Sequence, residues 1–245
     1  MRRVCGGRLA VMGQLGTRTA TAGAATRLRA WTVAAWAALG WAVFTLLVLH
    51  AVSSFDPVRD PVSRYAFTAE GAGMLEASLI SFAIGVVAVH RVLVGSGVRV
   101  SGTATALVAV TTAGLVAAAL FPATYTDDID PVSGLIHQYA SLLAFLSLPG
   151  IALCVLEHCQ DSASAGVRAR LTRLLVADLA ALALFGASYC LDNFLPPTLV
   201  YSSLAEVLPV GGVQRVVLVL HVFLLATLLT VARRPRGEPS ADVPE

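Results

Sequence analysis

Six apolar stretches, each long enough to cross a lipid bilayer, constrain the fold of this 245-residue chain more than any other feature. They run Trp31–Val52, Ala72–Val89, Val100–Leu120, Val132–Leu156, Leu174–Leu191 and Val207–Val231. A membrane-spanning helix needs roughly 20 mainly apolar residues. The composition agrees, since only 13% of the residues are charged, against about 25% in soluble proteins. The sequence therefore predicts an all-α, polytopic membrane protein with six transmembrane helices.

The six spans leave no room for a separate soluble domain. We expect residues 1–29 to form a basic, disordered cytoplasmic arm, residues 30–232 the six-helix bundle, and residues 233–245 a short cytoplasmic tail. The arm is rich in arginine and free of acids, as the start of a signal peptide is. However, the apolar stretch that follows is longer than the roughly 7–15 residues of a signal-peptide core. We therefore expect the first helix to stay in the mature protein, whether translation starts at Met1 or at Met12.

The distribution of arginine predicts the orientation of the bundle. All 17 basic residues are arginines, and 14 of them lie in the arm, the second and fourth loops and the tail, all on one side of the membrane. The other side has only Arg59, Arg64 and Arg215. Because arginine-rich loops stay in the cytoplasm, we expect both termini there (N-in/C-in), in the cytoplasmic (plasma) membrane of a bacterium.

An internal repeat marks two of the outer loops. The tetrapeptide Asp-Pro-Val-Ser occurs at Asp60–Ser63 and again at Asp130–Ser133. Aspartate is a favoured N-cap. Proline is favoured at the first position of a helix, because a backbone N–H at that position would make no hydrogen bond within the helix. Both copies therefore predict helix starts.

A second recurrence marks the outer ends of the three returning helices. Glu76, His137 and Arg215 each follow a glycine by three residues, which suggests three tandem helical hairpins with one ionisable group apiece at similar depth. Such groups face the bundle interior and pair with one another. Two interpretations stay open: Glu76 and Arg215 lock two helices together, with His137 completing the hydrogen bonds, or all three line an outward-facing polar pocket. The further lining residues of that pocket would be His50, Asp56, Asp60, Ser63, Arg64, Tyr65, Asp128 and Asp192.

Two other polar residues lie deeper in the predicted spans. Asp178 lies about two turns into the fifth helix, and His221 lies near the middle of the sixth. Either residue could belong to a proton path, or could bond a neighbouring hydroxyl or carbonyl group.

Several short motifs resemble a bacterial multi-pass family, the domain of unknown function numbered 998. They are Ser63-Arg64-Tyr65, Ala77-Ser78, Phe121-Pro122, His137 and Ala144-Phe145-Leu146. The resemblance covers Ala30–Leu156 well and the last two helices loosely, through Gly212 and Arg215. It implies a six-helix bundle and leaves the activity unassigned.

Three classes of function remain open from the sequence. The first is a non-enzymatic bundle that binds or moves a small amphiphile, an ion or a proton through the outer pocket. The second is an intramembrane metal-dependent hydrolase acting on lipid, with His50, His137 and an outer aspartate as ligands. The third is a haem protein, for which His50, His90 and His137 are the available histidines. We favour the first and predict no cofactor, no metal site and no nucleic-acid partner. Membrane lipids are the expected partners, and the oligomeric state is not predicted.

Overall fold

The computed structural model describes the backbone of residues 5–68, 71, 73–125, 129–158, 165–194 and 207–232, and the side chains of this set from residue 23 on, except 192–194. Its elements are α1 (Cys5–Val52), the short 3₁₀ helix η1 (Val62–Phe67), α2 (Met74–Gly95), α3 (Gly102–Leu120), α4 (Pro131–His158), α5 (Ala165–Phe194) and α7 (Val210–Ala232). The six α-helices coincide with the six apolar stretches, and each contains a segment long and apolar enough to span a membrane. The described residues contain no strand, so the predicted all-α fold is confirmed.

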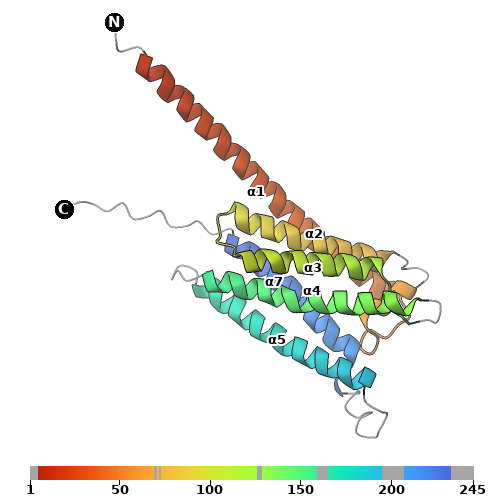
Figure 1. Ribbon diagram of the computed structural model, residues 1–245. Coiled ribbons are helices and arrows are strands. Elements are labelled where there is room, and N and C mark those ends of the chain that lie inside the picture. Colours follow the sequence, from red (N-terminus) through yellow and green to blue (C-terminus); the bar gives the residue numbers. More distant parts are fainter. Residues whose placement is uncertain are drawn as a thin grey trace.

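Consecutive helices form three hairpins: α1 packs mainly on α2, α3 on α4, and α5 on α7 (Figure 1). Contacts of α2 with α3 join the first two hairpins, and α7 also lies against α2 and α4. The predicted tandem hairpins are therefore present. We call the end of the bundle at which α1 ends and η1 lies the η1 end, and the other the opposite end.

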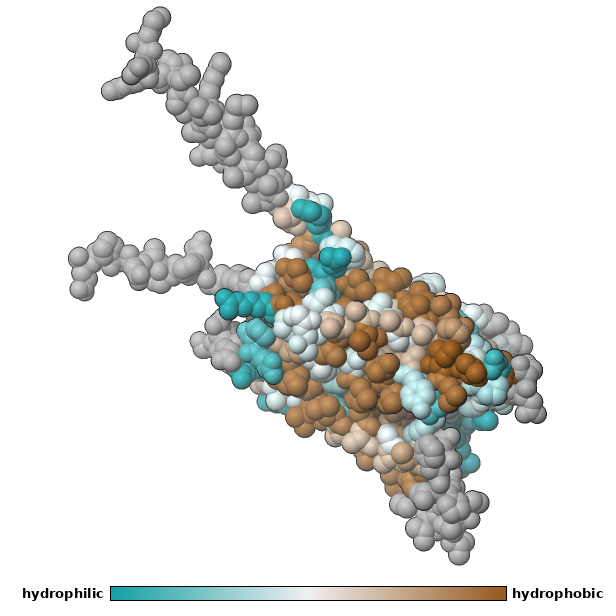
Figure 2. Space-filling model, in the orientation of Figure 1, coloured by the Kyte–Doolittle hydropathy of each residue, from teal (hydrophilic) through white to brown (hydrophobic). Residues whose placement is uncertain are grey.

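The surface of the bundle is apolar along the helices. Figure 2 shows brown, hydrophobic residues along the side of the bundle and teal, hydrophilic residues toward its ends. Large apolar side chains are exposed on several helices, among them Trp41, Leu47, Leu143 and Leu153. An apolar surface of this extent is unfavourable in water and favourable in lipid. The chain is thus a multi-pass membrane protein.

Helix α1 extends further toward the N-terminus than the sequence predicts. It begins at Cys5, so the backbone of residues 5–29 continues the first helix where a disordered arm was expected. The segment contains no proline, and its many alanine, leucine and arginine residues have high helix propensity. The side chains of residues 5–22 and the whole of residues 233–245, the expected tail, lie outside the described residues.

Candidate functional site

The two copies of Asp-Pro-Val-Ser differ in structure. In the second copy, Asp130 caps α4 as predicted: its Oδ1 accepts a hydrogen bond from the backbone N–H of Val132 (2.9 Å). In the first copy a helix also starts, but it is the 3₁₀ helix η1, it begins at Val62, and Asp60 does not cap it. The Val62 N–H donates instead to Oε1 of Gln214 on α7 (2.7 Å).

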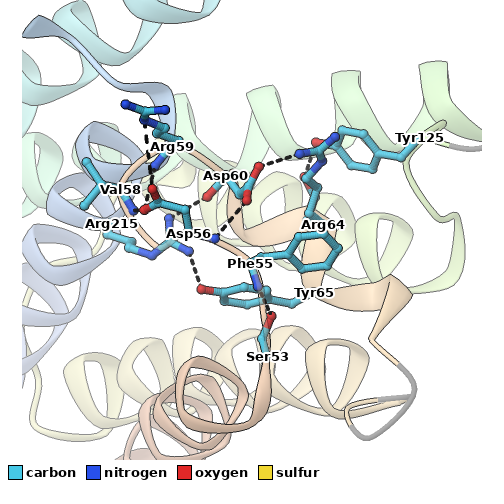
Figure 3. A network of polar contacts seen from close by, with 11 residues as sticks. Ser53, Phe55, Asp56, Val58, Arg59, Asp60, Arg64, Tyr65, Tyr125 and Arg215 are labelled. Atoms are coloured by element: carbon cyan, nitrogen blue, oxygen red, sulfur yellow. Dashed lines mark hydrogen bonds and ion pairs between the residues drawn. The ribbon is translucent and has the colours of Figure 1, made fainter. Parts of the chain in front are cut away.

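The aspartate of the first copy has other partners. One carboxylate oxygen of Asp60 accepts from the backbone N–H of Asp56 (2.9 Å), and the other pairs with the guanidinium of Arg64 (Figure 3). The Arg64 guanidinium also lies over the rings of Phe55 and Tyr125, at 5.7 and 5.4 Å from their centres. Asp60 thus organises the loop before η1.

Arg215 is the centre of the polar network at the η1 end. Its Nε donates to Nε2 of His50 (2.6 Å) and its Nη2 to the hydroxyl of Tyr65 (2.7 Å), the latter drawn in Figure 3. Its Nη1 donates to two backbone carbonyls, those of Asp60 and Gly211 (2.8 Å each). Four of the five N–H groups that a guanidinium carries are therefore used by protein acceptors.

The start of α7 is shaped to receive this loop. The Gly212 N–H donates to the carbonyl of Val58 (2.7 Å). A Cβ on Gly211 would overlap the carbonyl of Asp60. The loop backbone therefore crosses directly over the first turn of α7, and a glycine at position 211 allows this approach.

Glu76 does not join the network. Although it lies in the first turn of α2, its Oε2 is buried and has no hydrogen-bond partner in the described part of the chain. The ion pairs found among the described residues do not include Glu76 with Arg215. The predicted lock between these two side chains is therefore wrong, because neutral acceptors from α1, η1 and the preceding loop surround the guanidinium instead.

His137 is engaged elsewhere, at the end of α3. Its Nδ1 lies 2.9 Å from the carbonyl oxygens of both Ala118 and Phe121. The last carbonyl groups of a helix lack partners within the helix, so His137 caps α3 from α4. The structure thus brings His50, Asp60, Tyr65 and Arg215 together and leaves His137 and Glu76 apart from them.

Ser63 and Tyr125 form a second contact at this end. Their hydroxyl oxygens are 2.8 Å apart. Tyr125 is 40% exposed, and partial desolvation raises its pKa above the ordinary value of 10.0, although the bond to Ser63 and the charge of Arg64 act in the other direction. Asp128 and the side chain of Asp192, two further predicted residues, lie outside the described residues.

The most buried polar contact lies in the middle of the bundle. Nε2 of His221 on α7 is 3.4 Å from Oδ1 of Asp178 on α5, with side-chain exposures of 3% and 0%. Within the described residues, neither carboxylate oxygen of Asp178 nor Nε2 of His221 has a hydrogen-bond partner. From the sequence, Asp178 and His221 were predicted as two separate polar groups. Their similar depth in the membrane is the feature of the sequence that could have paired them. Asp178 lies 13 residues after the start of α5, and His221 lies 11 residues before the end of the antiparallel α7, so both lie at a similar distance from the opposite end of the bundle.

A small cavity adjoins this pair. It has a volume of about 50 Å³, and its lining includes His221, Ser141, Thr111 and Ala118. The ring of Phe145, another lining residue, lies 5.5 Å from the ring of His221. The pair therefore borders a space between α2, α3, α4 and α7.

The histidines proposed as metal or haem ligands are separated by these contacts. Nδ1 of His50 bonds the carbonyl of Leu46 (2.7 Å) while its Nε2 accepts from Arg215. Nε2 of His90 lies 3.2 Å from the hydroxyl of Thr105. Across the described ranges, no three His, Cys, Asp or Glu side chains come close enough to hold a metal ion.

Comparison with known proteins identifies the family. The sequence model of a family described as "Protein of unknown function (DUF998)" matches residues 36–231. No curated protein and no solved structure matches the chain significantly. The match covers most of the chain, including the two helices for which the resemblance is loose. The chain therefore belongs to the DUF998 family.

Proposed function

Since the chain is a DUF998 membrane protein, we propose that its bundle binds a proton at Asp178 and His221 and moves it between the membrane interior and the η1 end. One observation carries the proposal. A carboxyl group and an imidazole, both almost fully buried, face each other at 3.4 Å, and the facing atoms have no hydrogen-bond partner in the described residues.

The charges of the pair favour a proton between them. With no proton, a carboxylate and a neutral imidazole carry a net charge of −1 in the bundle. An ionisable group at the centre of a span costs about 2.5–3.5 kcal/mol on the insertion scale. One proton makes the pair neutral overall, whichever residue holds it.

The absence of other partners separates this pair from a structural one. Buried polar groups that stabilise a fold are normally satisfied by several hydrogen bonds. Asp178 and His221 have only each other in the described part of the chain. A proton can therefore leave or arrive without breaking a hydrogen-bond network that holds the helices together.

The size of the cavity favours a proton over the larger ligands that the sequence leaves open. A buried water needs roughly 10–15 Å³ of accessible space, so a cavity of about 50 Å³ holds a few water molecules and no amphiphile. At the η1 end, the Arg215 guanidinium is used by protein acceptors, which argues against an anion pocket there. No contact among the described residues favours the lipid hydrolase or the haem protein.

The surroundings of the protein are part of the proposal. The arginine distribution supports a bacterial cytoplasmic membrane as the location, with both termini in the cytoplasm and the η1 end outside. Lipids are then the immediate partners, and the arginines near the cytoplasmic leaflet are attracted by its anionic head groups.

Infrared difference spectroscopy of the protein in lipid vesicles tests the proposal. Spectra recorded over a wide pH range should show carboxyl and imidazole bands that change together. Both changes should disappear in Asp178→Asn and in His221→Gln. They should persist in Asp56→Asn, which alters a carboxylate that is 50% exposed.

A second measurement covers variants that fail to fold. Nitrogen-15 NMR of histidine-labelled parent protein reports the protonation of each imidazole directly. A buried histidine signal that changes with pH supports proton binding. Spectra in which only exposed histidines and carboxylates respond to pH would overturn it.

A further inference from the structure

We infer that Asp178 and His221 exchange their proton with the η1 end alone, through water in the cavity, while a packed apolar layer closes the opposite half of the bundle. This inference rests on the proposed function and adds the route and its direction.

The cavity occupies the half of the bundle nearer the η1 end. Ala118, two residues before the end of α3, lines it. His221 also lines it, 11 residues after the start of α7. At a rise of about 1.5 Å per residue, His221 lies roughly 16 Å below the start of its helix. The carbonyl of Ala118 contacts Nδ1 of His137 (2.9 Å), so the cavity lining runs from a residue that touches His137 down to His221.

The lining offers hydrogen bonds to water. The hydroxyl of Thr111 donates to the carbonyl of Leu107 (2.8 Å), and this residue is 0% exposed. Ser141 is half-buried, lines the cavity, and lies one helical turn from Phe145, whose ring contacts His221. A water molecule in a buried site needs two to four polar partners. Ser141 and His221 supply two, and most of the other lining residues are apolar.

The opposite half of the bundle is packed with buried apolar side chains. After His221, the α7 residues Leu224, Leu225, Leu228 and Leu229 are at most 1% exposed. They belong to one apolar cluster that includes Val86, Val89, Val92 and Leu93 of α2 and Ile151, Ala152 and Val155 of α4. Protein interiors packed in this way contain few voids as large as a water molecule. A proton therefore meets water on one side of the pair and packed methyl groups on the other.

The silver ion tests the direction, because it is compact, does not cross lipid readily and reacts with thiols. The parent for this experiment has its four cysteines replaced by alanine and is checked for a folded, monodisperse state. Ser141→Cys places a thiol in the cavity, and Ala152→Cys places one of similar size in the apolar layer, where Ala152 is 0% exposed. Silver is added to one side of sealed membrane vesicles of either orientation. Blocked thiols are then counted with a fluorescent maleimide after denaturation.

We expect Ser141→Cys to be blocked at least ten times faster from the side of the η1 end, and Ala152→Cys to be blocked from neither side. Equal blocking of Ser141→Cys from both sides, its complete resistance, or blocking of Ala152→Cys from the opposite end would overturn one-sided access. The silver reaction does not require His221 to change protonation. If the infrared test fails and the silver test succeeds, proton binding is refuted and one-sided access to the cavity stands. If the infrared test succeeds and the silver test fails, proton binding stands and one-sided access is refuted.

Discussion

Nε of Arg215 donates to Nε2 of His50 at 2.6 Å, and this bond joins the first helix of the bundle to the last. The other ring nitrogen of His50, Nδ1, contacts the carbonyl of Leu46 at 2.7 Å. A carbonyl oxygen only accepts, so Nδ1 carries the hydrogen, and Nε2 provides the lone pair that Arg215 needs. His50 is therefore a neutral imidazole of defined tautomer, and the guanidinium beside it also holds η1 through Tyr65.

The first prediction is that Arg215→Ala and His50→Ala are non-additive. Arg215→Ala leaves several buried or half-buried acceptors without a donor, and each such group costs about 1–3 kcal/mol. Once Arg215 is absent, His50→Ala has one bond fewer to lose. In detergent, the melting temperature of the double variant should therefore fall by less than the sum of the two decreases that the single variants show. Arg215→Lys should recover little of the stability that Arg215→Ala loses, since an ammonium group lacks the planar guanidinium fork that reaches several acceptors.

Glu76 provides the matched control for this cycle. Because its carboxylate makes no contact with Arg215 in the structure, Glu76→Gln and Arg215→Ala should add within about 0.5 kcal/mol. A strong coupling between Glu76 and Arg215, together with additivity between His50 and Arg215, would show that the helices pair differently.

The six helices could be predicted because length and apolarity decide them locally. The partners of each polar side chain could not, because they depend on the rotation and tilt of one helix against another. One helical turn shifts a side chain by about 5.4 Å, which is enough to replace Glu76 by His50 as the partner of Arg215. The sequence gives no signal for Gln214, since an amide in an apolar segment carries no charge, although its side chain accepts a hydrogen bond from the first N–H of η1.

Asp178 and His221 show a different limit. Their helical positions could be predicted, but their contact requires α5 and α7 to pack as a pair with these two faces together. The sequence shows how deep each residue lies in the membrane, but it does not show which sides of α5 and α7 face each other.

The second prediction concerns the contact between α3 and α4. A Cβ on Gly114 would lie 2.5 Å from the carbonyl oxygen of Ala140 and 3.2 Å from the Cβ of Ala144. Small residues let membrane helices approach closely, so Gly114→Ala should separate the helices and lower the melting temperature. Gly40→Ala is the control, because nothing lies within 4 Å of a Cβ there. It should be neutral or stabilising by up to about 1 kcal/mol. Equal effects of the two substitutions would contradict close packing at Gly114.

The third prediction is a loss of stability at alkaline pH that depends on Tyr125. Partial desolvation raises its pKa above 10.0 in the folded protein, although the residue is 40% exposed, so folding favours the neutral phenol. The contribution is complete below pH 10.0 and is lost as the pH rises through the folded pKa. The melting temperature of the parent should therefore fall more steeply above pH 10 than that of Tyr125→Phe. Tyr139→Phe, at a residue 61% exposed, should follow the parent. If the melting temperatures of all three proteins fall in parallel above pH 10, ionisation of Tyr125 does not destabilise the fold and the prediction is wrong.

The last prediction is the topology. Arginine in short loops resists translocation across the membrane, and the loop between α2 and α3 and the tail carry Arg99 and Arg236, whereas the η1 end is acidic. Reporter domains fused after Arg99 and after Arg236 should therefore be active only as cytoplasmic reporters. Fusions after Asp130 and after Pro197 should be active only as external reporters. Replacing Arg91 and Arg99 by glutamine weakens the signal at one loop while the other arginines remain, so we expect the orientation to persist. An external signal after Arg236 together with a cytoplasmic signal after Arg99 would require an odd number of spans between the two sites and would overturn the arrangement of three hairpins with both termini on one side.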